Sequence, residues 1–428
     1  MFKKSISLKY KKQIEENLVV NIPSSKSISN RLLVIRDLST DNGDIEDIST
    51  SEDTWMLNNF IQASANKTNS TFFCKNSGAV IRFLLALLST KEGSWTIDAD
   101  KRMQNRPLLP LIDILNELGA DIRIRDKENI FPIRIYGKKL SSKGVIVLEN
   151  NLTSQIISAL LLISTKITNG LTLRLPPNQV SKPYIDMTIA LLNRFGANIK
   201  VIDNLLVCSE GRYKFNNIRV EKDYSCASFF YLYVAVGKLQ QLRIKSLQAS
   251  TLQGDYVCVD LFQRLGVRTI FDSDGAILYY DKELADKSLK LEFDLQDYPD
   301  LFCPLVVGSY LSGKETSIIN LSSLKVKESD RLENMIRELN KLGKRCYKQE
   351  DNLFILPFFD NSLQPSNIGF SNTQTTNPFF HTYEDHRIAM SLSAIAFVCS
   401  GIEIENPTCV SKSFADFWDP ASKFFDLC

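Results

Sequence analysis

One pattern occurs four times in this sequence, and it limits the possible folds more than any other feature. Each copy combines the end of an amphipathic helix, a glycine and a short strand of alternating polarity. Glycine takes positive φ most easily at the end of a helix, because it has no Cβ. The copies read "ILNELGADIRI" (114–124), "LLNRFGANIKV" (191–201), "LFQRLGVRTIF" (261–271) and "ELNKLGKRCYK" (338–348). The pattern predicts a repeated helix–turn–strand unit.

The spacing of the copies indicates the size of that unit. Their glycines, Gly119, Gly196, Gly266 and Gly343, are 77, 70 and 77 residues apart, and a polar turn and a second strand follow each copy. This period is longer than that of ordinary solenoids. We therefore expect compact repeats grouped into domains, not one doubly wound sheet. The stretch 57–73 is a candidate degenerate further copy.

Segments between the copies supply further helices. Three of them are apolar on nearly every side, which is typical of helices buried at the centre of a domain. They are "SQIISALLLIS" (154–164), "ASFFYLYVAVG" (227–237) and "HRIAMSLSAIAFVCSG" (386–401). The polar tract 364–377 is predicted to be one long surface loop.

Composition argues against several classes of protein. The net charge of +2 gives no overall field that would attract nucleic acid or a membrane surface. No apolar run is long enough to span a membrane, and the N-terminus lacks a secretory signal. The nine cysteines are scattered without a CxxC, and the chain has only two histidines, His381 and His386, so a metal site has little material. We expect a cytoplasmic protein with reduced thiols and no metal.

Nine short polar motifs lie outside the repeated pattern. Almost all place Lys or Arg beside Ser, Thr, Asn, Gln or Gly at the edge of an apolar run. They are "SSKSISNR" (24–31), "KNSGAVIR" (75–82), "QNRPL" (104–108), "LTSQ" (152–155), "VSKPYID" (180–186), "YPDLF" (298–302), "KVKESDR" (325–331), "YEDHR" (383–387) and "CVSKSF" (409–414). Singly, each fits a solvated helix face, a turn or a helix cap. Together they predict a polyanion-binding cleft built from many element ends.

Four of these motifs carry a resemblance. "SKSISNR", "SKPYID", "VKESDR" and "DHRIAM", in this order, resemble the 5-enolpyruvylshikimate-3-phosphate synthase family, and the likeness extends over residues 21–414. It implies an α/β (α+β) fold of two domains in an inverse α/β architecture, with a cleft between them. Each domain would hold three βαβαββ repeats around buried helices. A discontinuous domain, 1–22 plus 222–428, would receive an inserted domain, 23–221, with crossovers near residue 22 and near Glu221–Asp223.

The resemblance also implies a reaction. The family moves the enolpyruvyl (1-carboxyvinyl) group of phosphoenolpyruvate to the 5-hydroxyl of shikimate 3-phosphate by addition and elimination. Phosphate is released, and the step belongs to the shikimate pathway of aromatic amino-acid biosynthesis. No cofactor would be needed, and the partners would be these two small molecules, with neither nucleic acid nor membrane, bound by a monomer. Two phosphates and two carboxylates in one place require several fixed cations.

The family pattern assigns binding roles residue by residue. The positions that would bind phosphoenolpyruvate are Lys26, Asn76, Gly78, Arg106, Gln155, Arg331, Arg387 and Lys412. The positions that would bind shikimate 3-phosphate are Lys26, Ser27, Arg31, Thr153, Ser154, Gln155, Ser181, Tyr184, Asp300, Ser323 and Lys327.

The same pattern assigns the proton transfers. Asp300 would take the proton of the 5-hydroxyl, and Glu328 would protonate the methylene carbon, so we expect a raised pKa for Glu328. Lys26 would stabilise or protonate the leaving phosphate. His386 would orient Glu328 or a phosphate oxygen.

The sequence departs from the common family pattern at a few positions, and three other functions remain as alternatives. Ser24, Ala79, Phe83 and Ser323 stand where the family usually has glycine, threonine, proline and asparagine. One alternative is the related enolpyruvyl transferase that acts on a UDP-amino sugar. The others are a catalytically silent homologue that binds phosphorylated metabolites and an RNA 3′-phosphate cyclase.

Overall fold

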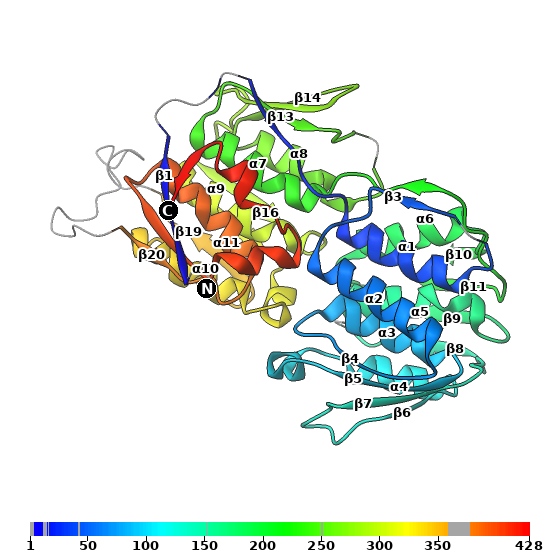
Figure 1. The fold of residues 1–428 in the computed structure, drawn as a ribbon. Helices are drawn as coiled ribbons and strands as arrows, with labels where there is room; N and C mark the ends of the chain where they lie inside the picture. Colours follow the sequence, from blue (N-terminus) through cyan, green and yellow to red (C-terminus); the bar gives the residue numbers. More distant parts are fainter. Residues whose placement is uncertain are drawn as a thin grey trace. The chain divides into compact units, whose positions relative to one another are not determined.

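The chain forms two compact units. The computed structural model describes residues 4–11, 15, 17–41, 43–150, 152–249, 251–357 and 377–428. One unit is Ser24–Val220, and the other joins Met1–Pro23 to Glu221–Cys428 (Figure 1). The two segments of the second unit meet where the Asp223 amide donates to the Pro23 carbonyl at 3.0 Å. The tract predicted as a surface loop, 364–377, lies outside the described residues except for Asn377.

Five four-stranded sheets share one strand order. In the first, β4 (Asn69–Phe73) runs parallel to β5 (Gly93–Asp98), which pairs antiparallel with β7 (Ile133–Gly137), and β6 (Asp121–Arg123) forms the edge. Three others repeat this order: β8 (Val145–Val147), β9 (Leu171–Arg174), β11 (Leu205–Cys208) and β10 (Ile199–Ile202); β2 (Leu18–Val20), β13 (Leu242–Lys245), β15 (Gly275–Tyr280) and β14 (Val267–Asp272); and β16 (Lys290–Asp294), β17 (Glu315–Ile319), β19 (Asn352–Ile355) and β18 (Cys346–Gln349).

The fifth sheet uses both ends of the described chain. Its order is β20 (Phe379–Phe380), β21 (Ile402–Glu405), β1 (Ser5–Tyr10) and β22 (Phe425–Leu427). β1 therefore lies between β21 and β22, in the inner position that the last strand of the repeat occupies in the other sheets. Leu8 of β1 pairs with Leu427 of β22.

The expectation of six complete repeats holds for five. In the described part of the sixth copy only β3 (Ile45–Glu46) and β12 (Ile218–Arg219) pair, and the closing hairpin is missing. The candidate copy at 57–73 does contain a helix followed by a strand. That strand is β4, however, which begins the next sheet instead of forming a hairpin.

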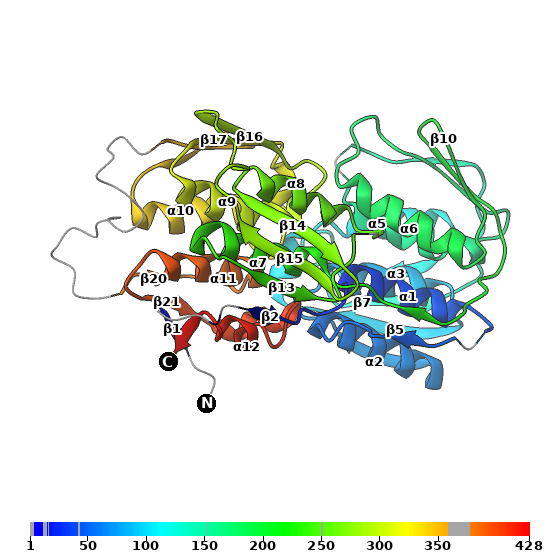
Figure 2. The same cartoon turned by 90° about the horizontal axis from the view of Figure 1, so that it is seen from above.

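Three helices in each unit pack against one another at the centre, with the sheets outside them (Figures 1 and 2). They are α1 (Lys26–Leu38), α3 (Gly78–Ser89) and α5 (Ser154–Leu162) in one unit, and α7 (Tyr224–Gly237), α9 (Phe302–Ser312) and α11 (His386–Leu392) in the other. The predicted buried helices at 154–164, 227–237 and 386–401 are confirmed. The last one changes to a 3₁₀ helix over Ser393–Phe397.

A second helix follows in each repeat. These are α2 (Glu52–Asn66), α4 (Leu109–Glu117), α6 (Lys182–Arg194), α8 (Cys258–Gln263), α10 (Arg331–Leu339) and α12 (Trp418–Ala421). The four repeat glycines lie at or just after the ends of α4, α6, α8 and the 3₁₀ turn that extends α10, and their φ values are +102°, +90°, +91° and +146°. The predicted positive-φ role of these glycines is confirmed.

In three copies an asparagine, three residues before the glycine, joins the helix end to the edge strand. Asn193 Oδ1 accepts from the Ile199 amide at 2.9 Å, and its Nδ2 donates to the Ile199 carbonyl at 3.2 Å. Asn116 holds Ile122 in the same way, and Asn340 holds Cys346. Because an edge strand has no neighbour on that side, the asparagine satisfies two backbone groups that would otherwise need water.

We expect Asn193→Ala to lower the free energy of unfolding by about 1–3 kcal/mol, because it removes both hydrogen bonds. The matched control is Gln263→Ala at the equivalent exposed position of the third copy, which should change stability by less than about 0.5 kcal/mol. Urea denaturation of the two variants measures both effects. Equal midpoints for the two variants would contradict a stabilising role for the asparagine.

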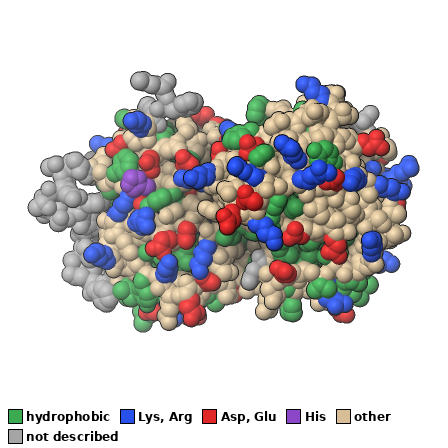
Figure 3. Space-filling view, turned by 90° about the horizontal axis from the view of Figure 1, so that it is seen from below, with side chains coloured by type: hydrophobic (Ala, Val, Ile, Leu, Met, Phe, Trp, Pro, Cys, Tyr) green, Lys and Arg blue, Asp and Glu red, His purple; other side chains and the backbone are tan. Residues whose placement is uncertain are grey.

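Other expectations concern the cysteine thiols, membrane-spanning helices and surface charge. All nine cysteines are free thiols, and six of them are buried, as expected for core residues. Within the described ranges, no helix is both long and apolar enough to traverse a bilayer. On the face that Figure 3 draws, basic and acidic side chains are interspersed, in keeping with the small net charge.

Candidate active site

Several of the residues predicted for the site lie at or near the amino ends of the central helices. In the unit of residues 24–220, Lys26 begins α1, Gly78 begins α3 and Ser154 begins α5. In the other unit, Asp300 lies in the 3₁₀ turn that leads into α9, and His386 begins α11. A helix amino end presents unpaired N–H groups and the positive end of the helix dipole. In each unit, the predicted residues therefore occupy positions that favour anions.

Arg331 is the centre of the polar network in the unit of residues 221–428. It is the first residue of α10 and only 1% exposed. Its Nε donates to Asp385 Oδ2 at 2.8 Å, its Nη2 to Glu328 Oε2 at 2.8 Å and its Nη1 to Asp300 Oδ1 at 3.2 Å. One buried guanidinium thus holds three carboxylates in fixed positions. These carboxylates raise the pKa of Arg331 well above its usual value, against the effect of burial.

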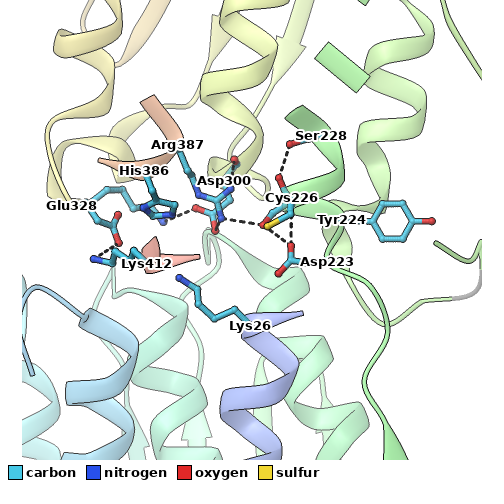
Figure 4. A network of polar contacts seen from close by, with 12 residues as sticks. Lys26, Asp223, Tyr224, Cys226, Ser228, Asp300, Glu328, His386, Arg387 and Lys412 are labelled. Atoms are coloured by element: carbon cyan, nitrogen blue, oxygen red, sulfur yellow. Dashed lines mark hydrogen bonds and ion pairs between the residues drawn. The ribbon is translucent and has the colours of Figure 1, made fainter. Parts of the chain in front are cut away.

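Asp300 lies among three cations. Arg387 Nη2 donates to its Oδ2 at 2.9 Å (Figure 4), and Lys327 Nζ lies 3.9 Å from its Oδ1. Burial alone would raise the pKa of Asp300, but Arg387, Lys327 and Arg331 together hold the pKa well below its usual range. The carboxylate is therefore ionised at neutral pH.

Glu328 faces a cation with each oxygen. Lys412 Nζ lies 3.2 Å from Oε1 (Figure 4), and Arg331 Nη2 donates to Oε2. The buried His386 has its Nδ1 3.8 Å from Asp385 Oδ1. The structure thus brings together Asp300, Lys327, Glu328, Arg331, Arg387 and Lys412, with His386 beside them. The raised pKa expected for Glu328 and the orienting role expected for His386 stay predictions.

Sequence reasoning assigned no role to Asp385. This carboxylate is fully buried, accepts from the Arg387 amide at 3.0 Å as the cap of α11, and also pairs with Arg331. The signal was an aspartate directly before an apolar helix, a capping pattern. Ser225 and Asp223 were also missed: Arg387 Nη2 donates to Ser225 Oγ at 3.1 Å, and that hydroxyl donates to Asp223 at 2.6 Å.

Arg31 is a buried cation in α1. Its guanidinium donates to Thr188 Oγ1 at 2.7 Å, the Ser27 carbonyl at 2.7 Å, Ser158 Oγ at 3.0 Å and the Tyr184 carbonyl at 3.3 Å. Burial lowers the pKa of Arg31 to about 10, and Tyr184 opposes the shift. No carboxylate of the described chain lies within ion-pair distance of it. A buried charge that lacks a counter-ion is costly, so this position suits an anionic ligand.

Two arginines surround Gly78. Arg106 Nη1 donates to the Asn76 carbonyl at 3.2 Å, while Arg82 Nη1 donates to Gln155 Oε1 at 2.9 Å and to the Gly78 carbonyl at 3.1 Å. A Cβ on Gly78 would lie 2.5 Å from Arg82 Nη1 and 2.6 Å from Arg106 Nη2. A side chain at this position would therefore force the two guanidinium groups to move. Arg82 was given no role from sequence, although it ends the "KNSGAVIR" motif.

The predicted hydroxyl residues lie at the amino ends of α5 and α6. Thr153 caps α5 by accepting from the Gln155 amide at 3.4 Å, and the buried Ser154 follows it. Ser181 caps α6 with φ +56°, a left-handed conformation that costs a non-glycine residue roughly 1–2 kcal/mol. Ser181 is also buried. Such strained, buried positions are frequent at ligand sites.

Lys26 and Ser323 were also predicted for the site. Lys26 Nζ donates to Asp53 Oδ2 at 3.0 Å, a partner that sequence reasoning did not identify. Ser323 lies in a 3₁₀ turn, Ser322–Val326, and its buried hydroxyl makes no hydrogen bond to any described residue. The structure does not bring Ser323 into the Arg331 network. Among the residues that the structure describes, no three His, Cys, Asp or Glu side chains are grouped to hold a metal ion.

A family model described as EPSP synthase (3-phosphoshikimate 1-carboxyvinyltransferase) matches residues 55–420. The chain belongs to the EPSP synthase family. Members named 3-phosphoshikimate 1-carboxyvinyltransferase include one from Bacteroides fragilis (strain ATCC 25285), which is 35% identical over 405 residues and covers 94% of each chain. Another, from Haemophilus influenzae (strain PittEE), is 29% identical over 438 residues and covers 96% of each.

Solved EPSP synthases confirm the fold class. An EPSP synthase from Acinetobacter baumannii superposes with a TM-score of 0.75 at 18% identity, over 99% of this chain and 100% of that one. The α/β fold that the motifs implied is therefore the fold of this EPSP synthase family member.

Proposed function

We propose that this chain transfers the 1-carboxyvinyl group of phosphoenolpyruvate to the 5-hydroxyl of shikimate 3-phosphate and releases phosphate, as a step in aromatic amino-acid biosynthesis. Membership of the EPSP synthase family supports this transferase activity and favours this acceptor over a UDP-amino sugar. The observation that carries the proposal is the buried network in which Arg331 and Arg387 hold the carboxylate of Asp300.

Both substrates carry a phosphate and a carboxylate, and the proposed ligands match these charges. For phosphoenolpyruvate they are Arg331, Arg387 and Lys412 in one unit, and Lys26, Asn76, Gly78, Arg106 and Gln155 in the other. In the described state, Arg331, Arg387 and Lys412 each face a carboxylate. An arriving anion would take over part of these interactions, so its binding is an exchange of partners.

The proposed ligands of shikimate 3-phosphate follow the same logic. Arg31 and Ser27 bind its carboxylate, which supplies the counter-ion that Arg31 lacks among the described residues. Thr153, Ser154, Gln155, Ser181 and Lys327 bind the 3-phosphate, with Tyr184 against the ring, and Lys26 and Ser323 contribute polar contacts. Charge-assisted bonds from helix amino ends suit the phosphate.

The proposed chemistry uses two carboxyl groups. Asp300 accepts the proton of the 5-hydroxyl while the hydroxyl oxygen bonds to C2 of phosphoenolpyruvate. Glu328 delivers a proton to the methylene carbon. In the resulting tetrahedral intermediate, the Glu328 carboxylate takes a proton back from that carbon and the C=C bond forms again. The C2–O bond to phosphate breaks in this step, with Lys26 stabilising the leaving group. Because substrate anions compete for the cations around Asp300, substrate binding should raise the pKa of Asp300 and make it a better proton acceptor.

The test is phosphate release from phosphoenolpyruvate with and without shikimate 3-phosphate. We expect release only when both are present, with the carboxyvinyl ether of shikimate 3-phosphate as co-product. Turnover with a UDP-amino sugar but not with shikimate 3-phosphate would overturn the choice of acceptor. Binding of both substrates without any phosphate release would favour a silent homologue.

We expect Gly78→Ala to raise the KM for phosphoenolpyruvate by about tenfold, because a new Cβ would displace the Arg82 and Arg106 guanidinium groups. The KM for shikimate 3-phosphate should change by less than about threefold. Gly144→Ala is the control, since a Cβ at Gly144 would meet nothing within 4 Å. Initial-rate kinetics with each substrate varied measure both effects. Equal increases in both KM values would argue against a selective role for this loop.

Glu328→Gln tests the proposed acid. We expect kcat to fall by about a hundredfold, because the amide cannot deliver a proton. Activity that depends on a protonated Glu328 falls as pH rises through the pKa of that group, so the variant should lose this alkaline decline. The pH–rate profile of kcat measures the change. A profile identical in shape to that of the unmodified protein would count against the acid role.

A further inference from the structure

Glu338 is a fully buried carboxylate outside the proposed catalytic set. It lies in the last turn of α10, seven residues after Arg331 and so on a similar face of the helix. Its Oε1 accepts from the Tyr383 hydroxyl at 2.6 Å, and its Oε2 accepts from the His381 amide at 2.9 Å and pairs with Lys341. Two of these three partners belong to the short segment that leads into α11.

That segment contains two successive residues in a left-handed conformation. Tyr383 has φ +53° and Glu384 has φ +57°. Neither is glycine, so each costs roughly 1–2 kcal/mol, and such a turn persists only if its surroundings hold it. The Asp385 amide donates to the Thr382 carbonyl at 2.8 Å and closes the turn. Asp385 and Arg387 follow the turn directly, so its shape determines where both side chains lie.

Helix α10 holds this segment at two points. At its first residue, Arg331 bonds the Asp385 carboxylate. In its last turn, Glu338 bonds the Tyr383 hydroxyl and the His381 amide. Figure 1 shows α10 and α11 in the same unit. The cation at one end of α10 and the buried carboxylate at the other thus act on one strained turn.

A simple stabilising ion pair does not account for this arrangement. Lys341 retains 31% exposure of its side chain, and a pair between exposed groups would avoid the cost of burying a carboxylate. Glu338 is 0% exposed, and it makes two hydrogen bonds to the turn in addition to the ion pair. The carboxylate of Glu338 is therefore buried where it contacts the turn, and not only where it pairs with Lys341.

We propose that Glu338 is a positioning residue, which braces the Tyr383–Glu384 turn so that Asp385 and Arg387 meet Arg331 in the geometry required for anion binding. The identity of that anion as phosphoenolpyruvate rests on the function proposed above. The brace itself rests on the contacts of α10 with residues 381–385.

The main variants are Glu338→Ala and Glu338→Gln. Alanine removes every bond of the brace, whereas glutamine can turn its oxygen toward Lys341 and the His381 amide and donate to the Tyr383 oxygen. For Glu338→Ala we expect the KM for phosphoenolpyruvate to rise about tenfold, with the KM for shikimate 3-phosphate changed less than about threefold. Glu338→Gln should restore the KM for phosphoenolpyruvate to within about threefold of its original value. The control is Glu333→Gln, an ion-paired residue on the same helix with 41% side-chain exposure.

A second readout does not depend on activity. Amide hydrogen exchange over residues 379–392 should be faster in Glu338→Ala than in Glu333→Gln. If the unmodified protein shows no turnover but this exchange difference is present, the function fails and the brace stands. If Glu338→Ala does not fold, Tyr383→Phe replaces it, with an expected rise of about threefold in the KM for phosphoenolpyruvate. Unchanged KM and unchanged exchange in a folded Glu338→Ala or Tyr383→Phe overturn the proposal.

Discussion

Asp300→Asn is expected to lower kcat by about a thousandfold, the largest effect on turnover among the substitutions considered. The amide keeps the shape of the side chain but cannot accept the proton of the 5-hydroxyl. It also removes the negative charge that Arg387, Arg331 and Lys327 face. Product formation at saturating concentrations of both substrates measures kcat.

The control for this prediction is Asp294→Asn. Asp294 is an exposed carboxylate at the end of β16 in the same unit. Its substitution should leave kcat within about twofold, since surface changes of this kind have small effects. A loss of less than about tenfold in Asp300→Asn would be incompatible with the role of proton acceptor.

Arg331→Met is expected to produce the largest loss of stability, about 3–5 kcal/mol. Methionine has a comparable length but leaves the buried Asp385 and the partly buried Glu328 and Asp300 without their shared cation. Because Arg331 helps to hold the pKa of Asp300 below its usual range, this part of its contribution is present at pH 8 and is partly lost at pH 3, so the deficit should be smaller at pH 3 than at pH 8. Chemical denaturation at both pH values measures it.

The control for the arginine is Arg268→Met. Arg268 is 42% exposed in its side chain and pairs with a single carboxylate, Asp281. Its loss should cost no more than about 1 kcal/mol. If Arg331→Met is no less stable than this control, or if its deficit grows toward acid pH, then the three carboxylates do not depend on Arg331 in the way described.

Local pattern was enough to predict much of the fold. Gly119 and its three counterparts follow the rule that a glycine just past a helix takes positive φ, and α5 and α7 are apolar on nearly every side. The incomplete form of the sixth repeat could not be predicted, because its two strands have two residues each and lie far apart in the sequence. Strands this short carry no measurable alternation.

Some contacts of the site could not be predicted, because the partners lie far apart in the sequence. Asp300, Glu328 and Arg387 came from motifs with a family resemblance, and the structure brings them together. Asp385 lies 54 residues from Arg331, and Thr188 lies 157 residues from Arg31. No local pattern links either pair, so these partners become visible only in the folded chain.

The chain leaves one unit at Pro23 and returns to it at Glu221, and these two points are bridged by the bond between the Asp223 amide and the Pro23 carbonyl. A polypeptide from which residues 24–220 are excised would therefore need only a short linker to run from β2 directly into α7. It would keep the order β2, α7, β13, α8, β14 and β15 without interruption. We expect the discontinuous unit to fold when its two segments are joined in this way, and the Arg331 network could then be titrated alone.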